Sequence, residues 1–380
     1  MFSIYPALRS ELGFSDVQLG LVGSTFTWTY SVCMVGTGRV ADLLRGDRVI
    51  LCSLVLWSLA TLGTALSGSA GVFLFWRAVM GVTESLYVPA ALSLIVALHG
   101  PASRSRALGI HLTAQLAGIV AGGSWGGWAA DRIGWRNGFA WMGAAGLIYA
   151  TVLWLPFRRL PALGPRTRTR DVSPAQAIHS SCYLALLAAF FAYCVMLWML
   201  YAWLPNFIYE RYGLSMAASG LTATLYLQTS TAAGVLAGTA AVDRLAARFP
   251  AVRLYLVGAG LLCSAPFAAL ALGSHSLAML KLSAAGFGLF GGCMMGNVYP
   301  ATCDVVDRRN YGFAVGVLNL FGGMAGGSAI FLAGWWKASI GIGPLMTAAA
   351  VFSAAAAVIL LGVTRLRFHV AAPAVTDFAT

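Results

Sequence analysis

Charged side chains are scarce in this sequence of 380 residues, where Asp, Glu, Lys and Arg together make up only 9%. Soluble proteins carry roughly 25% charged residues, so this chain lacks the side chains that build a water-facing surface. Hydrophobic residues make up 59% of it, and the mean hydropathy is +0.80. The composition excludes a soluble globular protein and predicts a polytopic membrane protein.

Lysine is nearly absent as well, because only Lys281 and Lys337 stand against 22 arginines. The formal net charge is +12, which by itself suggests an acidic partner. A nucleic-acid-binding protein, however, presents its basic residues on one face of a soluble fold. We therefore expect no nucleic-acid partner.

Features of metal and catalytic sites are also missing. The seven cysteines form no CxxC pair, and the five histidines are dispersed along the chain, so neither a disulfide framework nor a metal cluster is expected. The string GGSWG at 122–126 and the string GFGLFG at 286–291 lie inside apolar segments with no strand before them. They are not expected to form a nucleophile elbow or a dinucleotide site. The sequence therefore predicts no enzyme, no metal and no cofactor.

Eleven apolar segments are long enough to cross a bilayer, for which a helix needs ~20 residues. Backbone groups in lipid must be hydrogen-bonded internally, so these segments are expected to be helices. The predicted fold class is all-α, with eleven full transmembrane helices after a short N-terminal stub, Met1 to Arg9. The segments cover about 17–38, 49–66, 71–98, 107–130, 139–156, 182–208, 216–242, 254–272, 277–303, 313–336 and 344–363.

Basic residues predict the orientation, because seventeen of them fall in one set of loops and five in the opposite set. By the positive-inside rule, the richer set and the C-terminus are expected in the cytoplasm, as in a multi-pass protein of a bacterial inner membrane. The longest polar stretch, 157–181, reads as a cytoplasmic linker. It separates an N-terminal bundle, 1–156, from a C-terminal bundle, 182–365, which a cytoplasmic tail, 366–380, follows.

An internal repeat relates the two bundles. Asp42 and Asp243 end helices at positions 201 apart, and the lone cations Arg77 and Lys281 open spans 204 apart. Repeated bundles in one orientation imply two related halves with a midplane site between them. Equal halves would have six helices each, so we expect most of the first helix to be missing and the natural start to lie upstream of Met1.

Three motifs carry a family resemblance. The segment GRVADLLRGDR contains Gly38, Asp42 and Arg48, and it is followed by RAVMGVTESLYVPA at 77–90 and WLPNFIYERYGLS at 203–215. The first resembles the first cytoplasmic loop of the major facilitator superfamily, and the others are similar to patterns of its anion:cation symporter branch. The resemblance implies a two-bundle secondary transporter that moves an organic anion, such as a sugar acid or carboxylate, together with protons.

Arg77 and Glu84 are the charged pair within one predicted helix. They are seven residues apart, so both project from one face with ~10 Å of rise between them. A charge at the bilayer centre costs ~3 kcal/mol or more, which requires a water-filled cavity or a partner. We expect Glu84 to bind and release a proton in competition with an anion at Arg77, as the branch resemblance implies. The alternative is a permanent structural ion pair.

Other polar side chains inside apolar helices need hydrogen-bond partners. A substrate offers such partners, and so does a neighbouring helix; packing and interface anchoring stay open for the aromatic residues. The resemblance places Tyr30 and Gln115 at substrate-facing positions. The candidate substrate-binding residues are Tyr30, Gln115, Trp198, Tyr201, Asn206, Gln228, Asn297, Tyr299 and Asn319.

Helix-end charges are expected to act in gating instead of substrate binding. Aspartates that cap helices and pair with loop arginines stabilise one of two alternating conformations. The candidate gating residues are Gly38, Asp42, Arg48, Asp243 and Arg244.

Two alternatives to the importer remain open. One is an exporter of drugs or metabolites with the same fold, and the other is a transport-inactive membrane sensor or scaffold. A membrane enzyme lacks any convergent nucleophile, metal or cofactor signature. The expected partners are a small organic anion, protons and the lipid bilayer, with the protein acting as a monomer.

Overall fold

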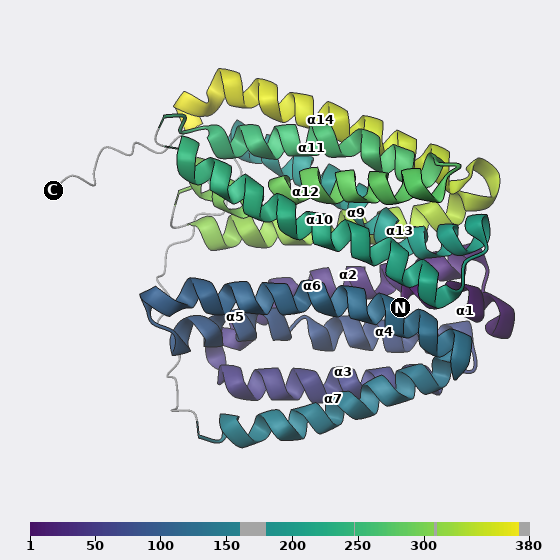
Figure 1. Ribbon diagram of the computed structural model, residues 1–380. Coiled ribbons are helices and arrows are strands. Elements are labelled where there is room, and N and C mark those ends of the chain that lie inside the picture. Colours follow the sequence, from purple (N-terminus) through teal and green to yellow (C-terminus); the bar gives the residue numbers. More distant parts are fainter. Residues whose placement is uncertain (160–179, 247, 308–309, 372–380) are drawn as a thin grey trace. The chain divides into compact units, whose positions relative to one another are not determined.

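The computed structural model describes residues 1–159, 180–246, 248–307 and 310–371 (Figure 1). These residues form α-helices joined by short turns, after one 3-10 turn at the N-terminus, and the described part of the chain contains no strand. The predicted all-α fold class is confirmed. The predicted linker, 157–181, and tail, 366–380, lie largely outside the described residues.

The chain forms two compact units. Apart from the gaps above, unit 1 comprises Met1–Thr169, Pro205–Leu221 and Ile330–Trp335, and unit 2 comprises Arg170–Leu204, Thr222–Ala329 and Trp336–Thr380.

The helices of the first half begin with the short turn η1, Phe2–Ile4, and the helix α1, Tyr5–Leu12, which together form the predicted stub. The remaining helices are α2, Asp16–Leu43; α3, Gly46–Ala65; α4, Ala70–Glu84; α5, Tyr87–Leu98; α6, Pro101–Arg132; and α7, Trp135–Phe157. Glycine at positive φ, Gly13 at +66°, ends α1 in the left-handed conformation that favours this residue.

The helices of the second half are uniformly long. They are α9, Ser181–Tyr212; α10, Met216–Leu245; α11, Val252–Gly273; α12, Leu277–Val305; α13, Tyr311–Ile340; and α14, Ile342–Ala371.

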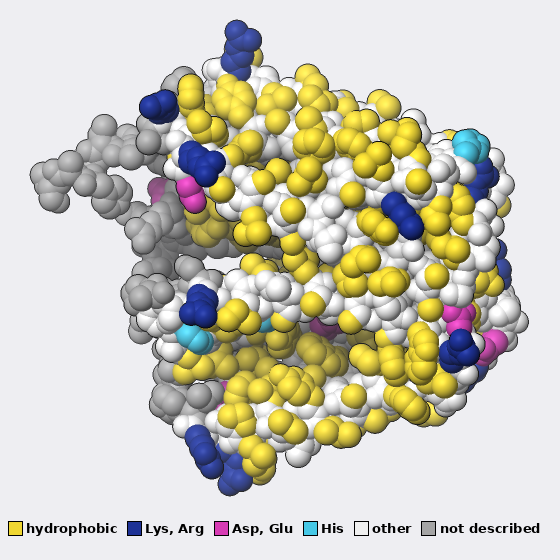
Figure 2. All heavy atoms as spheres, viewed as in Figure 1, with side chains coloured by type: hydrophobic (Ala, Val, Ile, Leu, Met, Phe, Trp, Pro, Cys, Tyr) yellow, Lys and Arg dark blue, Asp and Glu magenta, His cyan; other side chains and the backbone are white. Residues whose placement is uncertain are grey.

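The predicted spans correspond to these helices, except that one is interrupted and that α2 and α10 are not among the described helices that are long and apolar enough to cross a membrane. Each of the eleven predicted segments is helical, but the segment 71–98 is divided into α4 and α5 by a turn at Ser85 and Leu86. With α4 and α5 taken together, nine helices among the described residues are long and apolar enough to cross a membrane by length and composition. Apolar side chains cover the long sides of the helices, and most Lys and Arg lie near helix ends (Figure 2).

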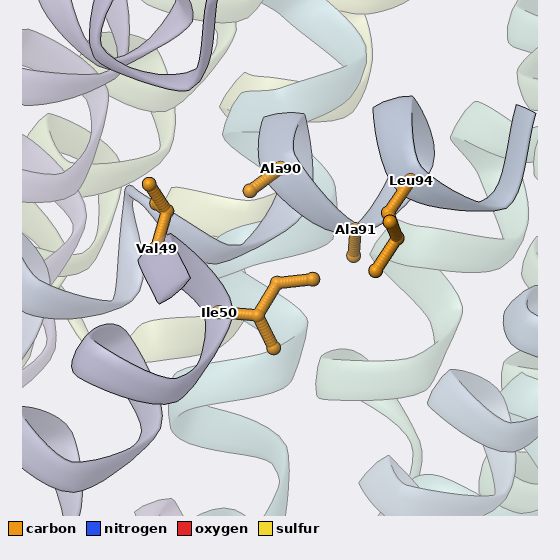
Figure 3. Close-up of a cluster of buried hydrophobic side chains, with 5 residues drawn as sticks. All are labelled: Val49, Ile50, Ala90, Ala91 and Leu94. Carbon is orange, nitrogen blue, oxygen red and sulfur yellow. The ribbon is translucent and has the colours of Figure 1, made fainter. Parts of the chain in front are cut away.

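Within unit 1, α3 packs against both α7 and α4, and α2 packs against α4; α3 and α7 run side by side (Figure 1). A buried cluster joins the first turn of α3 to α5, where Val49 and Ile50 face Ala90, Ala91 and Leu94 (Figure 3). Because α5 is anchored on α3 in this way, the turn that precedes it has a fixed position. Within unit 2, α11 packs against α12 and α14.

Candidate functional site

The two charged residues predicted to couple transport lie on one helix, α4, and Glu84 is its last residue. The helix stops there because Pro89, four residues beyond Ser85, has no N–H to donate to the Ser85 carbonyl, and its ring clashes with that group. Glu84 therefore stands at a break in a membrane-spanning segment, next to a two-residue turn, Ser85 and Leu86, whose backbone keeps right-handed helical dihedral angles.

Two buried serines satisfy backbone carbonyls at this break. The Ser53 hydroxyl of α3 donates to the Thr83 carbonyl at 2.7 Å, and the Ser85 hydroxyl donates to the Val82 carbonyl at 2.7 Å. Both serines are fully buried. A backbone acceptor without a partner in lipid would cost several kcal/mol, so these hydroxyls stabilise the interruption beside Glu84.

Arg77 lies two turns earlier on α4, and only 5% of it is exposed. Its Nε donates to the Val22 carbonyl of α2 at 3.1 Å, and one terminal nitrogen lies 3.1 Å from the Met80 sulfur. Its guanidinium carbon lies 4.6 Å from the ring centre of Phe26. Among the described residues no carboxylate forms a salt bridge with Arg77, Glu84 included. The arrangement is thus a buried cation without a paired anion.

Close packing of α4 on α2 positions both charges. A Cβ on Gly81 would lie 2.7 Å from the Phe26 carbonyl oxygen and 3.0 Å from the Tyr30 amide nitrogen, and it would also clash with the Thr29 hydroxyl. Only glycine fits at this contact, which lies between Arg77 and Glu84 in the sequence.

A cavity of about 420 Å³ lies inside unit 1, and Arg77 is on its wall. Its other lining residues come from α3, α4, α6, α7 and the N-terminal turn, and many are aromatic. The indole nitrogen of Trp125, which also lines the cavity, is buried and has no acceptor among the described residues. Glu84, Tyr30 and Gln115 are not among the lining residues.

The predicted substrate residues that belong to unit 1 lie apart from this cavity. Tyr30 is half-buried and stacks on Phe26, with ring centres 5.8 Å apart. Gln115 is exposed on α6. Asn206 of α9 is 2% exposed, and its side-chain nitrogen finds no acceptor in the described part of the chain.

Four of the candidate residues in unit 2 form two interhelical pairs. The Gln228 amide of α10 donates to the Tyr201 hydroxyl of α9 at 2.8 Å, and the Tyr299 hydroxyl of α12 donates to Asn319 Oδ1 of α13 at 2.9 Å. The Gln228 amide oxygen is buried and has no donor among the described residues. The Trp198 ring meets that of Tyr201 edge-on at 5.8 Å.

Asn297 and Asn319 also bond to their own helices. The Asn297 amide donates to the Cys293 carbonyl at 2.8 Å, and the Asn319 amide donates to the Val315 carbonyl at 2.9 Å. Each side-chain nitrogen thus donates one of its two hydrogens within its own helix.

The candidate gating residues are not brought together by any described contact. Arg48, Asp243 and Arg244 are exposed, and none of them forms an ion pair with another described residue. Gly38 and the side chain of Asp42 lie outside the part of the structure whose contacts are described.

An ion pair in unit 2 is not among the residues predicted from the sequence. One terminal nitrogen of Arg253, at the start of α11, lies 3.0 and 3.2 Å from the two carboxylate oxygens of Asp304, at the end of α12. The internal repeat offered a signal for it, because Arg253 follows the candidate Arg48 by 205 positions.

A polar cluster that holds the N-terminal stub is not predicted from the sequence either. Glu11 accepts hydrogen bonds from the Trp135 indole at 2.8 Å and from Arg136 at 2.5 Å, and Arg136 also donates to the Ser67 carbonyl at 3.3 Å. The cluster ties α1 to the start of α7.

Comparisons with known proteins agree with this architecture. The model of the Major Facilitator Superfamily matches residues 1–244, which is more than half of the chain. The chain belongs to the Major Facilitator Superfamily. A likeness to solved structures supports the fold: a bacterial homologue of the human lysosomal transporter Spinster, inward-facing and occupied, superposes with a TM-score of 0.82 at 20% identity, over 97% of this chain and 93% of that one.

Curated relatives of this superfamily member carry transporter names. A probable galactarate/D-glucarate transporter, GarP of Escherichia coli K12, is 24% identical over 358 residues, which cover 84% of this chain and 79% of that protein. A probable sulfoacetate transporter, SauU of Cupriavidus necator, is 26% identical over 275 residues. The match covers 66% of this chain and 61% of SauU, so it spans less than two thirds of that relative.

Proposed function

We propose that this superfamily member is a secondary active transporter that moves an organic anion, a sugar acid or other carboxylate, in symport with protons. The observation that carries the proposal is Arg77, a buried cation on a cavity wall to which no carboxylate of the described residues is paired. A charge buried in a bilayer marks a substrate or ion pathway, and an arginine recognises a carboxylate through two parallel hydrogen bonds. The names of GarP and SauU support an anion as substrate.

Glu84 is proposed as the proton-coupling residue. It is the last residue of α4, and the carbonyl end of a helix carries partial negative charge. A proton on Glu84 removes a like charge from that end, while an anion bound at Arg77 neutralises the guanidinium. Binding of the proton and of the substrate anion are thereby linked through one helix.

The polar side chains of the two halves are proposed to hydrogen-bond the substrate. In unit 2 the buried Gln228 amide oxygen can accept a hydrogen bond from a substrate hydroxyl. Tyr201, Tyr299 and Asn319 would exchange their interhelical bonds for bonds to the substrate. The other proposed contacts are Tyr30, Gln115, Trp198, Asn206 and Asn297.

We assign conformational gating to the helix-end groups Gly38, Asp42, Arg48, Asp243 and Arg244. The protein is proposed to lie in a bacterial inner membrane as a monomer with a cytoplasmic C-terminus, since the basic loops predict that orientation. Transport without catalysis is proposed, with 1–156 and 182–365 as the two bundles.

Uptake into proteoliposomes tests the proposal. Purified protein is reconstituted, an inward proton gradient is imposed, and the accumulation of labelled galactarate, glucarate, sulfoacetate and small carboxylates is followed. We expect at least one anion to accumulate and a protonophore to abolish that accumulation. An outward proton-driven flux would identify an exporter, and ligand binding without counterflow by folded protein would contradict transport altogether.

A further inference from the structure

We propose that Asp131 of α6 holds a gate closed at the end of the protein opposite the basic loops, by accepting hydrogen bonds from the first turn of α10. The outer gate is defined as the contact between the C-terminal end of α6 and the N-terminal end of α10. The assignment rests on the proposed function, because alternating access requires a contact of this kind to open and close. Three observations support it, and all of them lie within unit 1.

The first observation is the carboxylate of Asp131, one residue before the end of α6. Its two oxygens accept hydrogen bonds from the backbone amides of Met216 at 3.2 Å and Ala217 at 2.8 Å. These amides belong to the first turn of α10, where an α-helix offers them no acceptor of its own, and the positive end of a helix attracts a carboxylate. A side chain of one helix thus caps another helix 85 positions away in the sequence.

The helix α10 also has a cap of its own. The hydroxyl of Ser215, the residue before α10, accepts a hydrogen bond from the Ala218 amide at 3.2 Å, which is the usual arrangement of a local N-cap. Asp131 binds the two amides that precede Ala218, and its bonds exist only while α6 and α10 stay in contact. Asp131 therefore stabilises the contact between the helices, whereas Ser215 stabilises the helix end alone.

The second observation is the close approach of the two backbones beside Asp131. A Cβ on Gly127 of α6 would clash with the Met216 carbonyl oxygen, and a Cβ on Gly220 of α10 would clash with the Gly123 carbonyl oxygen. Glycines let two membrane helices approach until their backbones touch. At these positions no side chains interlock, so the helices can separate there without repacking, and the bonds of Asp131 oppose that separation.

The third observation is that the internal repeat produces a second contact of the same kind. The helices α2 and α10 begin 200 positions apart, and α6 and α13 end 208 positions apart, so the contact of α2 with α13 corresponds to that of α10 with α6. A Cβ on Gly20 of α2 would lie 3.1 Å from the Ile330 carbonyl oxygen of α13, and one on Gly23 would lie 3.0 Å from the Ile330 side chain. A contact that recurs in both parts of a repeat is expected at a gate, because repeat-related elements move against each other in alternating access.

Opening of the outer gate exchanges the bonds of Asp131 for bonds to water. The side chain of Asp131 is exposed, so water replaces its amide partners readily and reduces the free-energy difference. Loss of a side-chain cap changes an equilibrium by about threefold to thirtyfold, and we expect the lower part of this range, about threefold to tenfold. A change of that size biases two states of similar free energy.

Access to a buried position measures the state of the outer gate without any substrate. Ser219 of α10 lies between Ala217 and Gly220 and is 1% exposed, so Ser219→Cys places a buried thiol there. Its labelling by a membrane-impermeant maleimide is followed on the full chain in right-side-out membrane vesicles, and the labelling of native cysteines in protein without this substitution is subtracted. We expect Asp131→Ala to raise the rate about threefold to tenfold, and Asp131→Asn, which keeps one acceptor oxygen, to raise it less.

Ser215→Ala is the matched control, because it removes the local cap of α10 and leaves the bonds between α6 and α10 in place. We expect its labelling rate to stay within about twofold of the rate with Ser215 and Asp131 intact. An equal rise in Ser215→Ala and Asp131→Ala would mean that fraying of α10 exposes Ser219, and it would overturn the proposal. An unchanged rate in Asp131→Ala would overturn it as well.

A reversible cross-link tests whether the two helix ends separate during transport. Asp131→Cys and Ala217→Cys are combined, oxidised in proteoliposomes and compared with each single variant in exchange of labelled galactarate, glucarate or sulfoacetate. We expect the oxidised double variant to lose exchange of the anion that wild type exchanges, and to regain it after reduction. Full exchange by completely cross-linked protein would contradict the gate.

The two assays separate the gate from the proposed function. An unchanged labelling rate in Asp131→Ala, in a protein that accumulates an anion, would overturn the gate and leave anion transport standing. A raised rate in Asp131→Ala but not in Ser215→Ala, in a protein that accumulates no anion, would support the gate and contradict the proposed function.

Discussion

The hydroxyl of Ser53 donates to the backbone carbonyl of Thr83 at 2.7 Å, one residue before Glu84. This bond joins α3 to α4 at the point where α4 ends. Because α5 is also packed on α3, through Val49 and Ile50 (Figure 3), both sides of the break rest on the same helix. The position of the Glu84 backbone is therefore set from α3.

Ser53→Ala removes this bond and leaves the Thr83 carbonyl buried without its partner. We expect a loss of about 1 kcal/mol in stability, because interhelical bonds in membranes average about 0.6 kcal/mol and an unsatisfied acceptor adds to that. Thermal unfolding in detergent measures it. Thr64→Val is the control, since Thr64 bonds only to Ala60 within α3; equal destabilisation of both variants would show that the break does not depend on Ser53.

Gly81→Ala tests the close approach of α4 to α2. The new methyl group would meet the Phe26 carbonyl oxygen at 2.7 Å, and such overpacking costs about 1–3 kcal/mol. The melting temperature is expected to fall, together with anion binding, because Arg77 and Glu84 move with α4. Gly118→Ala on α6 is the matched control, since nothing lies within 4 Å of its added Cβ, and it is expected to keep or raise the melting temperature. A tolerated Gly81→Ala would contradict the packing.

A double-mutant cycle measures the ion pair of Arg253 and Asp304. The variants are Arg253→Gln, Asp304→Asn and both together, followed by thermal unfolding. Both side chains are partly exposed, at 32% and 20%, so solvent screens the pair, and we expect a coupling free energy of about 0.5–1 kcal/mol. A coupling near zero would mean that the two helices are held by apolar packing alone.

Much of the fold could be predicted from the sequence, because hydrophobic length and internal hydrogen bonding leave few choices in a bilayer. The eleven segments and the stub were placed in this way. The break at Ser85 is not predicted from the sequence, although Pro89 belongs to the segment RAVMGVTESLYVPA. A proline in a membrane helix is tolerated wherever neighbouring side chains satisfy the freed carbonyls, and the contribution of Ser53 from another helix is not written in the local sequence.

The candidate site, like the fold, could be predicted from the sequence only in part. An unpaired polar side chain in lipid costs free energy, so polar residues inside apolar helices could be predicted as candidate site residues. Examples are Tyr201, Gln228, Tyr299 and Asn319. Their pairing could not, because it depends on which helices are neighbours. The cavity beside Arg77 was also beyond the sequence, since its walls come from four helices and the N-terminal turn.

The central claim is that Glu84 carries the proton that drives anion accumulation. The most direct test compares proton-gradient-driven accumulation with gradient-free exchange of the same labelled anion in proteoliposomes, for wild type, Glu84→Gln and the control Glu210→Gln. Glu210 is exposed and bonds to Arg9. We expect Glu84→Gln to keep exchange and lose accumulation, while Glu210→Gln keeps both. Undiminished proton-driven accumulation by Glu84→Gln would contradict it.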